Sequence, residues 1–245
     1  MENINLYTYG RSTVNGSWWI NQNRIVNRLY YVNSGKARVT YSSMEYELTA
    51  GNLYVIPGCK AFHPLNAWNF DHTYFDFYYS RILNNEKIIE LDESTGLAKN
   101  FFDYVNDLIK NDSERNAFPA MEHFLCGFFS LCECQKIPLP YIANPTVTEA
   151  LSLIHTECAD VSTKILAQKL NIDESYFIRI FSSVTGITPM KYIRAYRVSM
   201  GKQLIRNGAS IAEAAEKCGY ASASSFYNAV KAELNISPSD FKEEH

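Results

Sequence analysis

Three side chains in the first third of the sequence could together form a polar binding surface. Tyr74, Asp76 and Tyr78 alternate with aromatic residues, so a β-strand would place their two phenols and one carboxylate on the same face. If that face lines a cavity, it suits a sugar or another hydroxylated compound. The same rings could equally fill a closed core. Further candidates for such a lining are Trp18, Asn33 and His63.

The spacing of histidine and cysteine residues gives no metal or redox site. The sequence holds five histidines without any His-X-His pair, and His63 and His72 are isolated from each other. Its six cysteines include no Cys-X-X-Cys pair, which is the spacing that thiolate zinc sites use. We therefore expect no metal and no cofactor, and reduced cysteines that pack as small hydrophobic residues.

Composition narrows the class of protein without identifying it. The 245 residues are enough for two domains with separate cores. No apolar run approaches the roughly 20 residues that cross a bilayer, and the N-terminus lacks a basic signal region, which predicts a cytoplasmic protein without a membrane partner. From Thr146 onward, eleven basic residues balance eleven acidic ones, so charge alone does not indicate a nucleic-acid partner.

The first 80 residues have the pattern of a β domain. Short runs rich in Tyr, Val, Ile and Phe alternate with turn sequences, and several short strands at this spacing favour a sandwich or barrel. The expected strands are residues 29–33, 37–41, 46–48, 52–56 and 73–79. The expected turns are residues 33–35, 42–43, 50–51 and 57–58.

Residues 81–136 change to a helical period. Two apolar stripes each fit one face of a helix, and helices this apolar must pack on the β domain, on each other or on a partner chain. The stripes lie at positions 97, 101, 102, 105, 108 and 109 and at positions 124, 125, 128, 129 and 132. Several prolines then interrupt both helix and sheet, which predicts a linker over residues 137–144.

Residues 145–245 are predicted to be helical and contain an internal repeat. Phe177 recurs as Phe226 and Pro189 as Pro238, each 49 residues later. Each copy has the pattern of a helix-turn-helix, and a helix over residues 190–206 joins the two copies.

Helix ends and outer faces can be predicted for both copies. In the first copy, Thr163 is expected to cap a short helix, and a second helix from Glu174 should stop at Gly186. In the second copy, Ser222 is the expected cap and Asn235 the expected stop, because Asn tolerates a left-handed backbone. The outer faces present Ser175, Ile178, Arg179 and Ser182 in the first copy and Ala223, Ser224, Tyr227, Asn228 and Lys231 in the second.

These residues closely resemble the AraC/XylS-type regulators over about residues 145–245. The likeness rests on Leu166-Ala167, Tyr176-Phe177, Arg179-Ile180-Phe181, Gly186, Pro189, Tyr192-Ile193, Arg197, Ile211, Ala215, Cys218-Gly219-Tyr220, Phe226 and Ser237-Pro238. The strands resemble the cupin-like ligand-binding domain of many such regulators, and the two helices resemble their dimerisation helices. The resemblance implies a cupin-like β-barrel sensor over residues 1–80, a helical dimerisation or packing segment over 81–136, the linker, and an all-α double helix-turn-helix domain over 145–245.

The resemblance also implies a role for each outer face. The second helix of each copy would enter successive major-groove segments about one helical turn (~34 Å) apart. Base contacts would come from Ser175, Ile178, Arg179, Ser182, Ser224, Tyr227 and Asn228, and phosphate contacts from Thr163, Lys191, Arg194, Ser222 and Lys231. Arg179 suits a guanine because its fork matches O6 and N7, and Asn228 suits an adenine.

The expected function is that of a ligand-responsive transcription regulator, with activation favoured over repression. Its expected partners are double-stranded DNA, RNA polymerase, a small effector such as a sugar, and a second copy of the chain. Two alternatives remain open. One is a relative that has lost DNA binding and acts through protein partners, which Ala223, Asn228 and the balanced charge allow. The other is a cupin-type small-molecule enzyme, for which no converging ligands are evident. Arg197 is expected to be structural, and Tyr227 could pack on the joining helix instead of contacting DNA.

Overall fold

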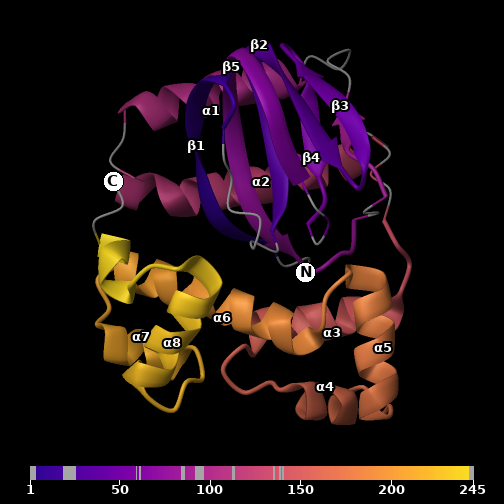
Figure 1. The fold of residues 1–245 in the computed structure, drawn as a ribbon, viewed down its shortest axis with the longest axis vertical. Helices are drawn as coiled ribbons and strands as arrows, with labels where there is room; N and C mark the ends of the chain where they lie inside the picture. The colour runs from indigo at the N-terminus through magenta and orange to yellow at the C-terminus, as the bar shows by residue number, and fades with distance from the viewer. Residues whose placement is uncertain are drawn as a thin grey trace.

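A curved β-sheet with two helices lies above a helical domain (Figure 1). The computed structural model describes residues 4–242 except 19–25, 59, 61, 84–85, 92–96, 112–113, 135, 138 and 140. The strands are β1 (Ile4–Gly16), β2 (Asn27–Tyr41), β3 (Met44–Thr49), β4 (Leu53–Ile56), β5 (Phe62–Tyr79) and β6 (Ile89–Leu91). They are followed by the helices α1 (Leu97–Asn111) and α2 (Glu114–Cys134).

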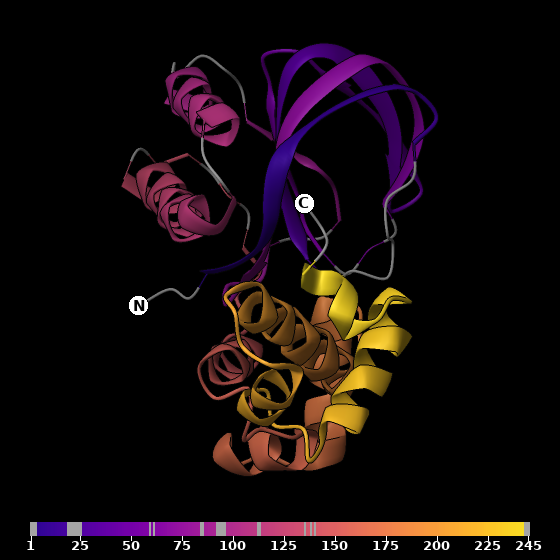
Figure 2. The same ribbon diagram turned by 90° about the vertical axis from the view of Figure 1, so that its left-hand side faces the viewer.

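The sheet is antiparallel and strongly curved. Its strands lie in the order β1-β5-β2-β4-β6, with β3 paired to the second half of β2. The curvature wraps one face of the sheet into a barrel-like interior, and α1 and α2 lie side by side on the opposite face (Figure 2). The predicted fold class, a cupin-like β domain with two packing helices followed by a helical domain, is confirmed.

The turn expected at residues 33–35 is wrong, because β2 continues through it. The register of β2 against β5 shifts twice between Val32 and Lys36, so the strand carries a bulge, and a bulge bends a strand. Gly35 has a φ of +73°, and a Cβ at this position would lie 2.1 Å from the carbonyl oxygen of Asn69. Glycine is therefore needed where the two bent strands approach each other.

Four of the five expected strands lie within β2, β3 and β5, and the fifth, over residues 52–56, overlaps β4 from Leu53 onward. Two further strands, β1 and β6, were not predicted. The turn at Ser42 and Ser43 is confirmed, with φ values of 51° and 67°. Strand β1 precedes the first expected strand, and β6 lies in the segment that the apolar period assigned to helices.

Alternate side chains of the sheet enter two separate cores. On one face, Tyr31 stacks on Phe102 of α1 with ring centroids 4.7 Å apart, and Phe129 of α2 joins the same cluster. On the other face, Tyr30 and Phe70 belong to a cluster in the barrel interior. The described side chains of the apolar stripes of α1 and α2 therefore pack on the chain's own sheet and on each other.

The C-terminal domain contains two helix-turn-helix units joined by one long helix. Before the first of these helices, Tyr141 forms a β-bridge with Leu83, and the amide of Ile142 donates to the carbonyl of Ile82 at 2.8 Å. The first unit contains α4 and α5, the second contains α7 and α8, and α6 belongs to the cores of both. The elements are α3 (Pro145–Thr156), α4 (Thr163–Lys169), α5 (Glu174–Thr185), α6 (Pro189–Arg206), α7 (Ile211–Lys217), α8 (Ala223–Leu234) and the 3₁₀ helix η2 (Pro238–Lys242).

The cap of α4 is Ser162, so the prediction of Thr163 as the cap is wrong. Ser162 has an extended backbone, and its hydroxyl accepts a hydrogen bond from the amide of Ile165 at 3.2 Å. Thr163 is already the first helical residue. The other expected caps and stops are confirmed at Ser222, Gly186 and Asn235.

The two domains share a core where they meet. Tyr7, Val26, Tyr78 and Ile82 of the N-terminal domain are buried in one cluster with residues of α3, α5 and α6. The ring of Tyr78 lies edge-on to that of Tyr196 on α6, with centroids 5.0 Å apart. Burial raises the pKa of the Tyr78 phenol well above its ordinary value, so the phenol stays protonated.

One residue of β1 bonds to a helix of each domain. The pairing of β1 with β5 shifts between Leu6 and Thr8, so the strand bulges at this point. The amide of Leu6 donates to Glu122 Oε1 of α2 at 2.9 Å, and the carbonyl of Leu6 accepts a hydrogen bond from Gln203 Nε2 of α6.

Candidate nucleic-acid interface

Helix α5 turns one side to the domain core and the other to solvent. Phe177 and Phe181 are fully buried and anchor the helix. Of the predicted base contacts, Ser175, Ile178 and Arg179 are exposed, and Ser182 is half-buried. The outer face of α5 is therefore open over its first turns and becomes less accessible towards Ser182.

Tyr176, which was not among the predicted base contacts, lies beside Arg179. The guanidinium carbon of Arg179 is 5.5 Å from the centroid of the Tyr176 ring, and the Tyr176 side chain is 42% exposed. A cation–π contact at an exposed site contributes about 0.5–1 kcal/mol, which favours the conformers of Arg179 that lie over the ring. The signal in the sequence was the i, i+3 spacing of the two residues on one helix face.

Helix α8 also has one buried and one exposed side, and Ser224 and Asn228 on its exposed side are shorter than Arg179. Ser224, Tyr227 and Asn228 are exposed, whereas Phe226 and Val230 are buried against α6 and α7. Tyr227 is 41% exposed and lies outside the apolar cluster that α6 and α8 share, which argues against the alternative that it packs on α6.

The predicted phosphate contacts have different surroundings. Lys191, Ser222 and Lys231 are exposed, and Thr163 is half-buried. Arg194 Nε donates to Glu233 Oε1 of α8, and Glu233 is buried. Because this carboxylate already holds the guanidinium, a phosphate would have to share Arg194 with it.

Arg197 has the structural role that was expected of it. Its guanidinium donates to three backbone carbonyls of the loop between α3 and α4. The acceptors are the carbonyl oxygens of Cys158 at 2.7 Å, Ala159 at 2.9 Å and Val161 at 2.9 Å.

Two of the predicted effector contacts lie inside the barrel. Tyr74 packs against the interior cluster, and Asp76 pairs opposite Arg28 in the register of β2 and β5. Arg28 Nε is 3.5 Å from Asp76 Oδ1, and both side chains are less than 10% exposed. Burial lowers the pKa of the neighbouring His72 to about 4, so its imidazole is neutral near pH 7. Among the described residues, aromatic rings and the Arg28–Asp76 ion pair lie in this interior.

The remaining predicted effector contacts lie elsewhere. Tyr78 is part of the domain junction, and His63 is exposed. Asn33 lies on the helix-covered side of the sheet, where it accepts a hydrogen bond from Asn106 Nδ2 of α1 at 2.8 Å. Trp18 lies at the edge of the interior cluster. The structure therefore does not bring the six predicted contacts together at one place.

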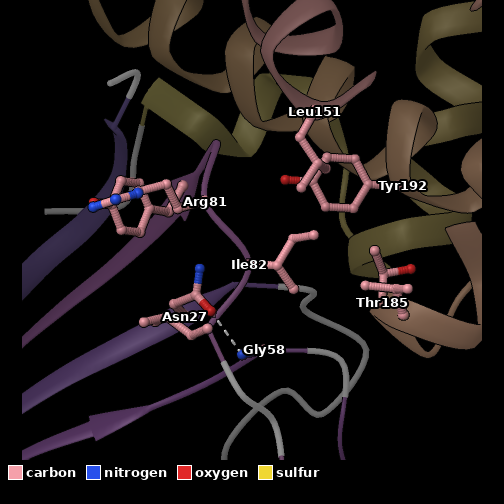
Figure 3. Close-up of a pocket in the computed structure, with 10 residues that line it drawn as sticks. Asn27, Gly58, Arg81, Ile82, Leu151, Thr185 and Tyr192 are labelled. Atoms are coloured by element: carbon pink, nitrogen blue, oxygen red, sulfur yellow. Dashed lines mark hydrogen bonds between the residues drawn. The ribbon is translucent and has the colours of Figure 1, made fainter. Parts of the chain in front are cut away.

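A small cavity lies at the domain junction (Figure 3). Its volume is about 40 Å³, which holds a few water molecules rather than an effector. The amide of Gly58 donates to Asn27 Oδ1 at 2.9 Å beside it. The other labelled side chains that line it are Arg81 and Ile82 from the N-terminal domain and Leu151, Thr185 and Tyr192 from α3, α5 and α6.

The described part of the chain contains neither a metal-ligating cluster nor a membrane-spanning helix. Among its residues, no three His, Cys, Asp or Glu side chains come close enough together to hold a metal ion. None of its helices has both the length and the apolar character needed to span a membrane.

Comparison with known proteins agrees with this architecture. Residues 166–244 match the family model of a helix-turn-helix domain. The chain is 22% identical over 235 residues to the Msm operon regulatory protein of Streptococcus mutans, covering 88% of this chain and 84% of that protein. It is 31% identical over 101 residues to the transcriptional regulatory protein HptR of Staphylococcus aureus, covering 41% of this chain and 39% of HptR. The chain thus matches less than half the length of HptR.

Among solved structures, ToxT from Vibrio cholerae has the same two-domain fold. The two chains superpose with a TM-score of 0.58 at 17% identity, over 99% of this chain and 97% of ToxT. The matched domain and the named relatives indicate a DNA-binding transcription regulator. The predicted resemblance to AraC/XylS-type regulators is confirmed for the two-domain fold and for the helix-turn-helix domain.

Proposed function

We propose that α5 and α8 enter two successive major-groove segments of one DNA site and that Arg179 is the main base-reading residue. The observation that supports this proposal is the exposure of Ser175, Ile178 and Arg179 on a helix that Phe177 and Phe181 anchor in the core. A guanidinium can bond to two acceptors of one guanine. The second helix offers the shorter side chains Ser224 and Asn228, so we expect the first unit to supply most of the specificity.

Selection of bound sequences from random duplex DNA tests this proposal. The wild-type chain should enrich a defined site of about 15–20 base pairs, and Arg179→Ala should lose the preference at one base pair and bind about tenfold more weakly, because a bidentate contact discriminates by about 1–3 kcal/mol. Arg38→Ala is the matched control, since it removes one exposed positive charge from β2, far in sequence from α5. No enrichment at low salt would refute direct DNA reading and favour the alternative in which the chain acts through protein partners.

A small-molecule effector is the second part of the proposal. One solved structure of ToxT holds an unsaturated fatty acid, whereas the polar lining in the sequence suggested a sugar. The barrel interior of this chain is largely aromatic and apolar, and Asp76 already pairs with Arg28. These contacts favour an apolar acid over a sugar. Thermal melting with a panel of sugars and long-chain fatty acids separates the two, because a ligand that binds the folded state raises the melting temperature.

The third part of the proposal is a homodimer, which exposed apolar side chains on α1 and α2 support. We infer a homodimer through the outer faces of α1 and α2, where Tyr104 is 54% and Leu131 is 43% exposed. The dimer would act in the cytoplasm without catalysis of its own and would activate transcription by contacting RNA polymerase. A reporter gene placed behind the selected site distinguishes activation from repression.

A further inference from the structure

The two helix-turn-helix units meet at the loop between α3 and α4. Arg197 extends from α6 to this loop and donates to the carbonyls of Cys158, Ala159 and Val161 at 2.7–2.9 Å. These carbonyls belong to the segment that leads into α4, the first helix of the first unit. The guanidinium therefore ties α6 to the first unit through three charge-assisted hydrogen bonds.

The turn of the second unit lies close against the same loop. Gly219 lies in the turn between α7 and α8 and has a φ of +75°. A Cβ at this position would lie 2.2 Å from the carbonyl oxygen of Ala159, which is also an acceptor of Arg197. The next residue, Tyr220, places its ring 6.0 Å from the Arg197 guanidinium. One side chain thus contacts the loop of the first unit and the turn of the second.

A lysine cannot reproduce this arrangement. The acceptors span four consecutive residues of the loop, and a guanidinium presents its donors in a flat fork that reaches several of them at once. An ammonium group is a compact charge at the end of a flexible stem. The substitution Arg197→Lys would keep the charge and most of the apolar stem but lose the simultaneous contact with Cys158 and Val161.

We propose that Arg197 is a positioning residue that fixes α8 relative to α5 and thereby sets the spacing of the two DNA segments that the protein reads. The proposal rests on the proposed function and adds to it the residue that determines half-site geometry. Helix α6 joins the two units covalently and sets the distance between them. The contacts of Arg197 and Gly219 with the Ala159 carbonyl fix how the second unit is tilted against the first.

The affinity for DNA sites with altered spacing between the two segments tests whether this tilt is fixed. One inserted base pair rotates the second segment by roughly 35° and moves it by about 3.4 Å along the axis, given 10–10.5 base pairs per turn. A rigid pair of units cannot follow that change, whereas a loosened pair can. The experiment measures Kd for the selected site, for the site with one base pair added or removed between its segments, and for the first segment alone.

The wild-type chain should lose about tenfold or more in affinity when the spacing changes, which corresponds to about 1.4 kcal/mol. Arg197→Lys should bind the first segment within about twofold of wild type, bind the full site more weakly, and lose less than about threefold when the spacing changes. Arg206→Ala, nine residues further along α6 and so on its opposite face, should behave like wild type.

Three results would overturn the proposal. Arg197→Lys could bind the full site with wild-type affinity and the same spacing dependence. It could lose affinity for the first segment as much as for the full site. It could also lose its cooperative melting transition, which would assign Arg197 to folding alone. Absence of any selected site for the wild-type chain is a different result, because it refutes the proposed function itself.

Discussion

Helix α6 contains a glycine at the point where α8 crosses it. A Cβ at Gly201 would lie 2.4 and 2.5 Å from two ring carbons of Phe226, and Phe226 is fully buried. Gly201→Ala therefore has two opposing effects. The helix gains about 1 kcal/mol in propensity, but overpacking of a filled core typically costs about 1–3 kcal/mol. Because the buried ring has little room to move, we expect a net loss of up to about 2 kcal/mol.

A second glycine in the middle of a helix provides the matched control. A Cβ at Gly127 of α2 would meet no atom within 4 Å, so Gly127→Ala should show the gain in propensity alone, about 0.5–1 kcal/mol. Urea denaturation of both variants gives the difference between them, which should be about 1–3 kcal/mol. An increase in stability for Gly201→Ala as large as that for Gly127→Ala would refute the conclusion that α8 packs on α6 through this glycine.

Three further predictions concern a cap, a titrating side chain and the dimer. Ser162→Ala should lower the free energy of unfolding by about 1 kcal/mol, because α4 loses its cap; an unchanged urea midpoint would contradict the assignment. Since the pKa of His72 is about 4 when folded and 6.5 in a model peptide, the unfolded chain binds this proton first as the pH falls. Stability should therefore fall by up to about 3 kcal/mol between pH 6.5 and 4, and His72→Phe should flatten that slope; equal slopes would argue against a buried neutral imidazole. Tyr104→Glu should shift sedimentation from dimer to monomer while the chain keeps a cooperative melting transition, and a wild-type chain that is monomeric at all concentrations would exclude the dimer.

The helical half of the chain was the more predictable one, because its signals are local. Gly186 and Asn235 both adopt the left-handed backbone that ends a helix, and side-chain chemistry alone indicated this. The wrong prediction of Thr163 as the cap of α4 also came from local side-chain chemistry. Two adjacent hydroxyl residues can both serve as caps, and only the backbone angles decide that Ser162 is the residue outside the helix.

The β domain was less predictable, because its structure depends on pairing between distant residues. The sequence around Gly35 has the composition of a turn, yet the partner strand β5 keeps β2 continuous and leaves a bulge. The alternation that grouped Tyr78 with Tyr74 and Asp76 is correct for the strand, but Tyr78 lies at its end, where α6 covers it. A sequence pattern gives the face of a strand and does not give the element that packs on it.

The bulge in β1 gives the N-terminal strand a mechanical role between the two domains. Leu6 is bonded through its amide to α2, the helix of the inferred dimer, and through its carbonyl to α6, the helix that joins the two DNA-binding units. A peptide strand is nearly inextensible, so a displacement of α2 along the sheet must either break the bond to Glu122 or be transmitted to Gln203. If α2 takes part in the proposed dimer, assembly and the orientation of α6 would be linked through a single backbone position.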